Sequence, residues 1–495
     1  MLAFMAGCAL VVGWQLPLGV SHTISVAQPV LVRARPPLAD AGEMHRMPLT
    51  GRPLSTADTK GSSTTTLSVL KSISEVPSEE WDACVRASSD SGEPFLSYQY
   101  LHALESSGSV DPNEGWMVQH LVAHDKTTGR LTGAVPLYLK SHSYGEYVFD
   151  HAWARSYRAS LSELSEPSAE AALHAVPAGD RNSYYPKLQG CVPFTPVAGA
   201  RLLIAATEPL CRASMRGVLA RGLVALANRL CVSSVHVTFS TREDGRALRA
   251  AGFLPRLGLQ YHWHNDGYRT FEDYLASLKQ SRRKAVRQER RKIHDAGIKV
   301  HRLRGAQIQP MHWEAFYGFY RSTIEQKWGH DYLKRPFFDA LGRHLTDRVL
   351  LVLAEDADGK MVAGALHLLG AECLYGRLWG CGQWHDSLHY ELCYYQAIEL
   401  AIELGLPRVE AGAQGEHKIA RGYMPTLTHS SHYLRDPGFK RAIQTMLDSE
   451  RENAYISLAT LATKQNPFKA APTRHLGRQG VQIDGQRLVV KRDCP

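Results

Sequence analysis

Two stretches of the chain repeat one pattern, and this repetition decides the fold class. Leu121 to Leu137 reads LVAHDKTTGRLTGAVPL, and Leu351 to Leu366 reads LVLAEDADGKMVAGAL. Each has an apolar run, an acidic turn with a glycine (Gly129 or Gly359), and a second apolar run that opens on Gly-Ala. This pattern predicts a β-hairpin. Because it occurs twice, about 230 residues apart, we expect two tandem domains related by duplication.

The segments around the hairpins alternate between strand and helix patterns, which predicts an α/β fold of mixed α+β layers. We expect a first domain over residues 67–262 and a second over residues 263–465. A Ser-, Ala-, Glu- and Pro-rich segment at about 156–182 predicts a surface insertion in the first domain. Residues 466–495 are rich in Lys, Arg and Pro, and we interpret them as a peripheral tail.

Residues 1–66 have the composition of a leader. The first part is apolar, but Gly13, Gln15 and Pro17 interrupt it, so it makes a poor transmembrane helix, which needs about 20 predominantly apolar residues. Residues 21–66 are rich in Ser, Thr, Pro and Ala and carry more arginines than acidic residues. We interpret the leader as a disordered transit peptide for a plastid or mitochondrion. A secretory signal, or an extension without an address on a cytoplasmic protein, remains an alternative.

The overall composition indicates large buried cores and an anionic partner. The chain has 495 residues, of which 44% are hydrophobic. A net charge of +9 suits phosphate-bearing co-substrates, RNA or membrane surfaces, although a surface rich in Lys and Arg gives the same charge without a ligand. Nine cysteines are scattered without a Cys-x-x-Cys pair. This predicts mostly reduced, buried thiols.

The clearest helix pattern begins after Ser387. Ser387 can cap this helix, and Asp386 lies favourably near the positive end of the helix dipole. At helical spacing, Gln396, Glu399 and Glu403 share one stripe, which we expect to be solvated.

The first turn of this helix carries the leading catalytic candidates. Glu391 falls off the polar stripe beside Tyr394 and Tyr395. A carboxylate there is a candidate general base, and either tyrosine can serve the leaving group. An ordinary first-turn acid is the alternative. His385 and His389 have the i, i+4 spacing of a zinc site, but that spacing alone is weak evidence. We predict no metal and keep His389 as a residue that can hold a catalytic water.

A glycine-rich loop follows the next strand pattern. It runs from Gly412 to Lys418 and continues through Arg421 and Gly422. Its glycines, including Gly415, allow a ligand to approach the backbone closely. A fixed cation here can hold a phosphate or stabilise an oxyanion. We therefore expect Lys418 in catalysis, and Gly412, Gly415, Arg421 and Gly422 at the co-substrate. A surface turn with solvated charges is the alternative.

The segment from Phe271 to Ile293 has two faces when drawn as one helix. Apolar residues, among them Ala285, occupy one side. The other side carries five cations: Arg283, Lys284, Arg287, Arg290 and Arg291. Such a face suits RNA phosphates or an anionic membrane surface, although a solvated face is the commoner outcome. No RRM or KH motif accompanies it.

Aromatic and charged residues predict a substrate groove between the domains. They are Tyr144, Tyr147, Asp150, Trp153, Tyr185 and Lys187 in the first domain and Trp263, Arg377 and Trp379 in the second. Core aromatics with a surface lysine explain half of the first-domain set equally well.

Several motifs, in one order, resemble the Fem-type (FemAB-like) predicted N-acyltransferases. They are Pro94-Phe-Leu-Ser97, Lys140-Ser-His-Ser-Tyr-Gly-Glu-Tyr147, Tyr184-Tyr-Pro-Lys187, Pro193-Phe-Thr-Pro196, Tyr261-His-Trp-His264 and Gly415-Glu-His-Lys418. The resemblance covers about 68–465 and implies two tandem GNAT-like (acyl-CoA N-acyltransferase) folds. It also implies transfer of an acyl or aminoacyl group from an activated donor to a small-molecule or peptide amine, with no covalent enzyme intermediate and no permanently bound cofactor.

The chain departs from the usual GNAT pattern at the cofactor. The pyrophosphate loop Gln/Arg-x-x-Gly-x-Gly/Ala is missing, which puts acetyl-CoA in question and fits the Fem-like branch, where aminoacyl-tRNA can be the donor. Because no recognised RNA module accompanies the basic face, we favour acyl-CoA as co-substrate over tRNA. A non-catalytic binding protein of the same fold and an RNA-binding accessory are the alternatives.

Overall fold

The computed structural model describes residues 65–89, 92–162, 183–327, 331–484 and 487–490. All of them lie in one of two contact-defined units, Leu38–Pro495. The expected leader up to residue 64 and residues 163–182 of the expected insertion fall outside the described residues. Within the described part, no helix has the length and apolar content needed to cross a membrane.

Both predicted hairpins are present and antiparallel. Their strands are β3 (His120–Asp125) with β4 (Leu131–Val135), and β11 (Val349–Glu355) with β12 (Met361–Leu369). Close to the turn, the register of each pair shifts: after Ala123 in the first hairpin and after Ala354 in the second. The shared bulge supports the duplication that the sequence predicts.

The remaining elements of the first half are listed here in chain order: β1 (Thr65–Leu70), α2 (Ser78–Ser88), α3 (Tyr98–Ser106), β2 (Trp116–Val118), β5 (Leu137–Lys140), α4 (His151–Ser162), β6 (Lys187–Gly190), β7 (Leu203–Ile204), α5 (Pro209–Leu230), β8 (Ser234–Val237), α6 (Arg242–Ala250) and β9 (Leu254–His264).

Those of the second half are α7 (Phe271–Ser277), α8 (Gln280–Asp295), β10 (Lys299–Arg304), α9 (Pro310–Lys327), α10 (Arg335–His344), β13 (Cys373–Cys381), α11 (Leu388–Tyr390), a π-helical turn η7 (Glu391–Tyr395), α12 (Gln396–Glu403), β14 (Arg408–Glu410), a 3-10 turn η8 (Glu416–Arg421), β15 (Met424–Leu434), α13 (Pro437–Lys464), α14 (Thr473–Arg478), β16 (Val481–Asp484) and β17 (Arg487–Val490).

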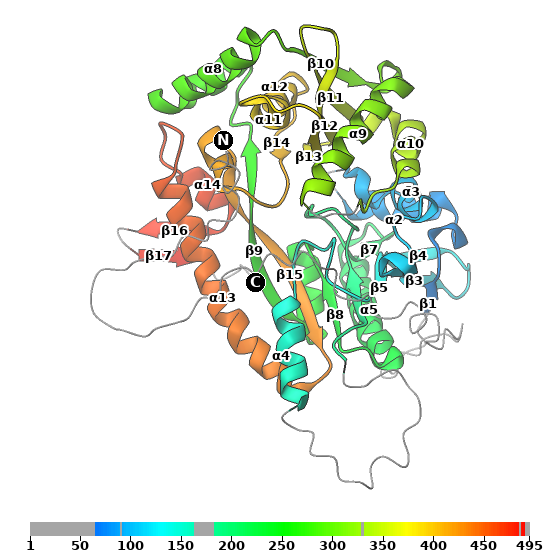
Figure 1. Cartoon of the computed structure of the whole chain (residues 1–495). Helices are drawn as coiled ribbons and strands as arrows, with labels where there is room; N and C mark the ends of the chain where they lie inside the picture. Colours follow the sequence, from blue (N-terminus) through cyan, green and yellow to red (C-terminus); the bar gives the residue numbers. More distant parts are fainter. Residues whose placement is uncertain (1–64, 90–91, 163–182, 328–330, 485–486, 491–495) are drawn as a thin grey trace. The chain divides into compact units, whose positions relative to one another are not determined.

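One eleven-stranded sheet joins the two halves. Its order is β10-β11-β12-β13-β14-β9-β15-β8-β6-β5-β2. The long strands β9 and β15 run side by side through its middle (Figure 1) and are exchanged: β9 pairs with β14 of the second half, and β15 pairs with β8 of the first. The expected boundary at residues 262/263 therefore falls inside β9. A second sheet, β1-β3-β4-β7, belongs to the first half.

Each half contains one parallel strand pair in an otherwise antiparallel arrangement. β13 pairs in parallel with β14, and β6 pairs in parallel with β8. A helix connects the members of each pair, α12 in the second half and α5 in the first, because parallel neighbours need a crossover. Antiparallel strands, a crossover helix and a parallel strand thus occur twice. The predicted mixed α/β fold with two tandem GNAT-like halves is confirmed.

The segment after Gln465 is not a peripheral tail. Leu476 and Val481 are buried in the core of the second half. The side chain of Gln479 accepts a hydrogen bond from the backbone N–H of Leu427 at 2.9 Å. The prediction weighed the Lys, Arg and Pro content and missed that a few well-spaced apolar residues are enough to dock α14 and the β16–β17 hairpin.

The predicted helix from Phe271 to Ile293 is broken. Between α7 and α8, Leu278 is extended and forms an isolated bridge with Phe468, and the backbone N–H of Lys279 donates to the carbonyl of Pro467 at 2.8 Å. Pairing with this later segment replaces one helical turn. It also changes the facing of α8, so that Ala285 is exposed instead of facing the core.

Candidate functional site

The parallel strands of the second half separate at one end, and we call this place the β13–β14 fork. The two strands pair at only three positions, of which Tyr375 and Glu410 are the last. β13 continues to Cys381, whereas the chain leaves β14 and turns into η8. Backbone groups beyond Tyr375 and Glu410 are thereby released from the ladder between these two strands, and a ligand can use them.

Lys418 lies in η8, eight residues after Glu410. Its side chain is only 3% exposed, and Nζ donates to the carbonyl of Gly412 at 3.1 Å. Gly412 has a left-handed backbone, with φ 78°, which glycine adopts without strain. Within the described part of the chain, no carboxylate forms an ion pair with Lys418. Burial lowers the pKa of its ammonium to about 8.

A cluster of rings lies beside Lys418. The hydroxyl of Tyr394 is 3.0 Å from Nε2 of His417. The ring of His389 lies 5.2 Å from those of both Tyr394 and Trp379. Desolvation, together with the charges of Lys418 and Arg421, lowers the pKa of His417 to about 4, although part of its ring is exposed. At neutral pH, His417 is therefore a neutral imidazole that can accept a proton.

His417 belongs to the Gly415-Glu-His-Lys418 motif, and the sequence predicted no catalytic role for it. Its ring packs on Gly415, where an added Cβ would lie 2.5 Å from the ring carbon Cε1. Gly415 also has a φ of 111°. The Gly-Glu-His-Lys spacing is thus the signal that locates His417, because only glycine leaves room for the ring.

Arg421 and Tyr395 lie together, but their polar atoms are bonded to other side chains of the protein. The guanidinium forms an ion pair with Glu289 of α8 at 2.7 Å and donates to the Tyr395 hydroxyl at 3.0 Å. The same hydroxyl donates to Glu289, and the ring of Tyr390 stacks under Arg421 at 3.4 Å. These contacts tie α8 to η8 and η7, which holds the loop that carries Lys418 in place.

Glu391 lies in a structural ion pair. Arg290 of α8 donates to both of its carboxylate oxygens, at 3.1–3.2 Å, and Gln396 donates to one of them at 2.6 Å. Glu391 is 4% exposed. The predicted solvated stripe is wrong for Gln396, which is buried under Arg302 of β10, while Glu399 pairs with both Arg290 and Arg302. Glu403 is exposed as predicted.

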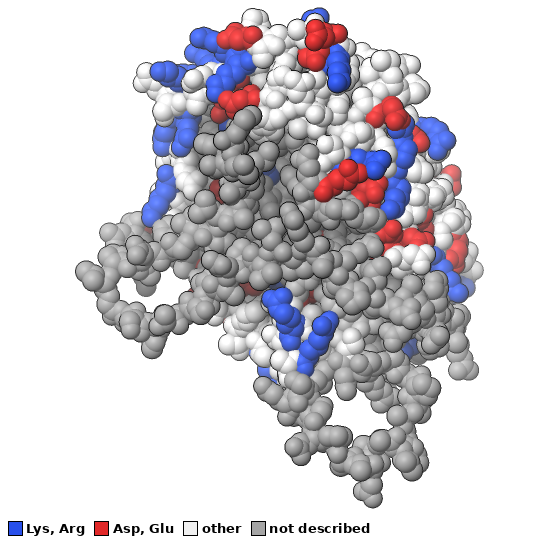
Figure 2. Space-filling model, in the orientation of Figure 1, with Lys and Arg blue, Asp and Glu red and all other residues white. Residues whose placement is uncertain are grey.

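The basic face on α8 is smaller than the sequence predicts. Arg290 turns inward to Glu391, and Arg287 pairs with Glu272 at 2.7 Å. Lys284 and Arg291 remain exposed and Arg283 is half-buried. Figure 2 shows lysine and arginine side chains along this edge of the second half, with acidic side chains among them.

Part of the predicted substrate groove is a buried charge network in the first half. Lys187 is fully buried and binds Asp150 and Glu146, the latter at 2.7 Å. Tyr185 donates to Asp150 at 2.8 Å, and Trp153 is buried against His432. The groove prediction is wrong for Asp150, Trp153 and Lys187, because their charges and rings satisfy one another inside the protein.

The other groove candidates are dispersed. Tyr144 is exposed, and Tyr147 has a left-handed backbone with φ 60°. Trp263 is fully buried. Arg377 donates to the carbonyl of Phe194 at 2.8 Å and thus links the two halves, while Trp379 lies by His389 as described above.

The equivalent fork of the first half is closed by a side chain. Beyond the pairing of β6 with β8, Arg201 is buried and its guanidinium donates to three backbone carbonyls, those of Thr238, Ala200 and Val197. Arg201 thus satisfies backbone carbonyls at this fork. The β13–β14 fork is therefore the candidate site.

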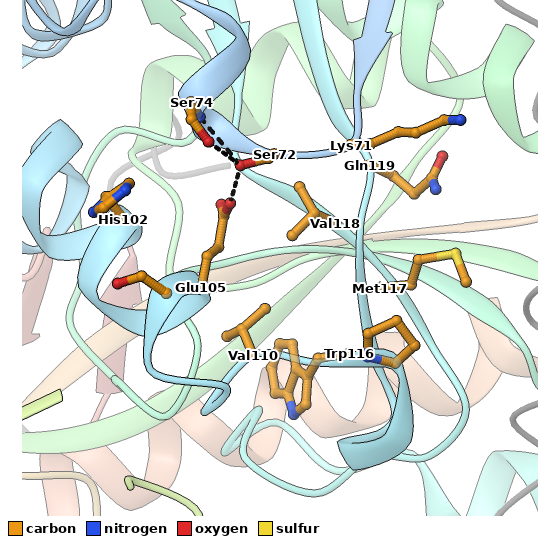
Figure 3. A pocket seen from close by; sticks show the side chains of 12 residues that line it. Lys71, Ser72, Ser74, His102, Glu105, Val110, Trp116, Met117, Val118 and Gln119 are labelled. Carbon is orange, nitrogen blue, oxygen red and sulfur yellow. Dashed lines mark hydrogen bonds between the residues drawn. The ribbon is translucent and has the colours of Figure 1, made fainter. Parts of the chain in front are cut away.

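A cavity of about 400 Å³ lies elsewhere in the first half. Figure 3 shows Glu105 of α3 beside Ser72, with Trp116 and Gln119 among the other residues that line the cavity. The Glu105 carboxylate accepts from Ser72 Oγ at 2.9 Å and from the backbone of Ile73 at 3.0 Å, and it lies 3.0 Å from His120. Since its oxygens are already bonded, this cavity offers no free carboxylate for catalysis.

A family model matches residues 72–163 and 171–470. The family is FemAB-like, described as peptidoglycan biosynthesis/recognition, and the chain belongs to it. No curated protein matches.

Solved structures give distant similarities. A structure described as FemX is 12% identical, with a TM-score of 0.44 over 74% of this chain and 98% of that one. N-myristoyltransferase of Saccharomyces cerevisiae with bound myristoyl-CoA is 10% identical, with a TM-score of 0.36 over 80% and 92%. A conserved protein of unknown function from Bacteroides thetaiotaomicron is 13% identical, with a TM-score of 0.40 over 74% and 98%.

Proposed function

We propose that the protein is an N-acyltransferase that moves an acyl or aminoacyl group from an activated donor to an amine. The observation that carries this proposal is Lys418, a buried cation held at the β13–β14 fork by the Gly412 carbonyl and without a carboxylate partner in the described structure. A buried charge without its counter-ion is costly unless a ligand supplies one. An acyl-transfer oxyanion is such a ligand.

The side chains around Lys418 supply the rest of the chemistry. The amine nitrogen attacks the acyl carbon, and the Lys418 ammonium stabilises the oxyanion that forms. When the bond to the leaving oxygen or sulfur breaks, Tyr394 gives that atom its hydroxyl proton. Neutral His417, 3.0 Å from the Tyr394 hydroxyl, accepts the proton that the attacking nitrogen loses and passes a proton on to the Tyr394 oxygen. Glu391 keeps η7 attached to α8 in this mechanism and does not act as the base.

The donor is an acyl thioester or an aminoacyl ester. We favour acyl-CoA, and one feature favours aminoacyl-tRNA as the second candidate. Exposed Asp386 lies at the start of α11 and pairs with Lys292 at 2.7 Å, so a carboxylate stands where GNAT folds place the donor pyrophosphate. Lys292 belongs to α8, which also carries the exposed cations Lys284 and Arg291.

The test is a transfer assay with two donor arms. Purified full-length protein is incubated with acyl-CoA or with an aminoacyl-tRNA pool, together with primary amines, and products are detected by mass spectrometry. Lys418→Met should lower turnover by roughly 10²–10³ without lowering the melting temperature. Lys440→Met is the matched control, because Lys440 also donates to a glycine carbonyl, that of Gly252 at 2.7 Å. Absence of transfer from both donors contradicts the proposal.

A further inference from the structure

Three buried residues with unbonded side-chain oxygens meet at the base of the fork. Both carboxylate oxygens of Glu93 lack a hydrogen bond within the described structure, and this residue is 3% exposed. The same holds for Oε2 of Glu410 and for the hydroxyl of Tyr375, both of which are buried. Buried polar atoms in native proteins are nearly always bonded, so three in one place require an explanation.

Contacts from both halves place these groups together. Tyr375 and Glu410 are register partners on β13 and β14. Phe95, two residues after Glu93, packs against the Tyr375 ring at 5.0 Å. The Glu93 carboxylate presses on Gly199, where an added Cβ would lie 2.2 Å from Oε1. Any other residue at position 199 would therefore displace the carboxylate.

The neighbouring charged groups do not bond Glu93. Arg201 donates to backbone carbonyls, and Arg408 pairs with Glu410 at 3.1 Å. Asp244 of α6 accepts from the backbone of Arg201 at 2.7 Å. Burial raises the pKa of Glu93 to about 7; Arg201 and Arg408 lower it, and Glu410 and Asp244 raise it further. Burial also raises the pKa of Tyr375, with smaller contributions from Cys373, Glu410 and Glu93.

We propose that these three groups bind the protonated primary amine of the acceptor and that Glu93 is the base that deprotonates it. A primary ammonium has three N–H donors and no acceptor. Glu93, Glu410 and the Tyr375 oxygen offer three acceptors. This inference rests on the proposed function and names its acceptor class, a primary alkylammonium.

The position suits the reaction. Gly412, whose carbonyl holds Lys418, follows Glu410 by two residues, a span of at most about 7 Å. The amine and the acyl carbonyl can thus be held at one fork. Glu93 takes one proton from the ammonium, the freed lone pair forms the bond to the acyl carbon, and the bond to the leaving group breaks. The carboxyl then returns its proton to water.

The test measures amine binding without a donor. Ethylammonium is titrated into the full chain at pH 8 by calorimetry, with tetramethylammonium, which has no N–H, as the comparison. Wild type should bind ethylammonium and not tetramethylammonium. Glu93→Gln should weaken ethylammonium binding roughly 10–100-fold, as loss of a charged hydrogen bond does. Glu416→Gln, which makes the same change on the exposed surface of η8, should bind as wild type does.

A second variant protects against a folding artefact. Tyr375→Phe removes a single hydroxyl and should weaken binding roughly 2–10-fold. Equal binding of ethylammonium by wild type and Glu93→Gln overturns the inference, and so does binding of tetramethylammonium with the affinity of ethylammonium. The binding experiment contains no donor. A protein that binds ethylammonium here but shows no acyl transfer in the donor assay therefore contradicts the proposed function and leaves this inference intact.

Discussion

The two forks of this molecule share a topology and differ in what occupies them. In the first half, Arg201 fills the space beyond β6 and β8, and Lys187 is neutralised by two carboxylates. At the fork of the second half, Lys418 has a carbonyl as its partner. Glu93, which the first half contributes to this fork, has no bonded partner among the described residues. One fork is thus complete without a ligand, whereas the other leaves buried charge of both signs to be satisfied.

The difference indicates which half carries the candidate site. The paired strands and the crossover helix are common to both halves and serve the fold. Unsatisfied polar groups reduce stability, so they persist where a ligand uses them. The comparison therefore predicts that the same substitution has opposite consequences in the two halves.

The largest stability effect is expected at Lys187. Lys187→Met leaves Asp150 and Glu146 buried without their cation, and it should lower the free energy of unfolding by about 3–5 kcal/mol. Lys418→Met removes a buried charge that lacks a counter-ion and should leave this free energy unchanged or raised. Urea titration of both variants measures the contrast. Equal losses of unfolding free energy in the two variants would contradict the proposed difference between the forks.

The next effect is a pH dependence at Glu93. The pKa of Glu93 is raised from 4.5 to about 7 in the folded protein, so the folded state holds an extra proton between these values. The free energy of unfolding should therefore fall as pH rises from 4.5 to 7 and then level off, by at most about 3 kcal/mol.

Glu93→Gln removes this slope. Its melting temperature should match that of wild type near pH 4.5 and exceed it at pH 8, which thermal unfolding across pH measures. If the variant is instead less stable than wild type at pH 8, Glu93 is a structural group, and the second fork resembles the first more than we propose.

A smaller loss of stability is expected at Glu391. Two interpretations of this residue predict different effects on turnover and on stability. As a general base, Glu391→Gln would lower turnover by roughly 10²–10⁴ with stability intact. As the ion-pair partner of Arg290, it should cost about 1–3 kcal/mol of stability, with turnover per folded molecule nearly unchanged. Calorimetry and the transfer assay on one preparation separate them, and we expect the second result.

Local patterns made much of the fold predictable. Each hairpin is encoded within a few residues by apolar runs and a glycine turn, so both were found. The exchange of β9 and β15 was not predictable, because an alternating strand pattern does not name its partner. The break between α7 and α8 depends likewise on pairing with residues near Phe468, which are distant in the sequence.

The residues of the candidate site also divide into those that local sequence patterns predicted and those that depend on distant contacts. Lys418 and Gly412 are six residues apart, and the glycine spacing pointed to them. Glu391 and Arg290 are 101 residues apart, so their ion pair was not predictable. The sequence instead suggested that Glu391 lies among aromatic residues and that Arg290 lies on a free basic face. Glu93 gave no sequence signal of its own, since a carboxylate before a proline is typical of a surface turn. Its burial arises from the packing of the two halves.

The smallest stability effect is expected on the exposed face of α8, and it decides the donor. Lys284→Glu with Arg291→Glu changes two exposed cations and should alter the free energy of unfolding by no more than about 0.5 kcal/mol. Arg290 is left in place because it holds Glu391. If aminoacyl-tRNA is the donor, wild-type affinity should fall linearly with salt on logarithmic axes, and the double variant should bind tRNA more weakly with a shallower slope. If acyl-CoA is the donor, the double variant should acylate as fast as wild type, because these cations are then only solvated. Normal tRNA binding by the variant would exclude Lys284 and Arg291 as the RNA contact.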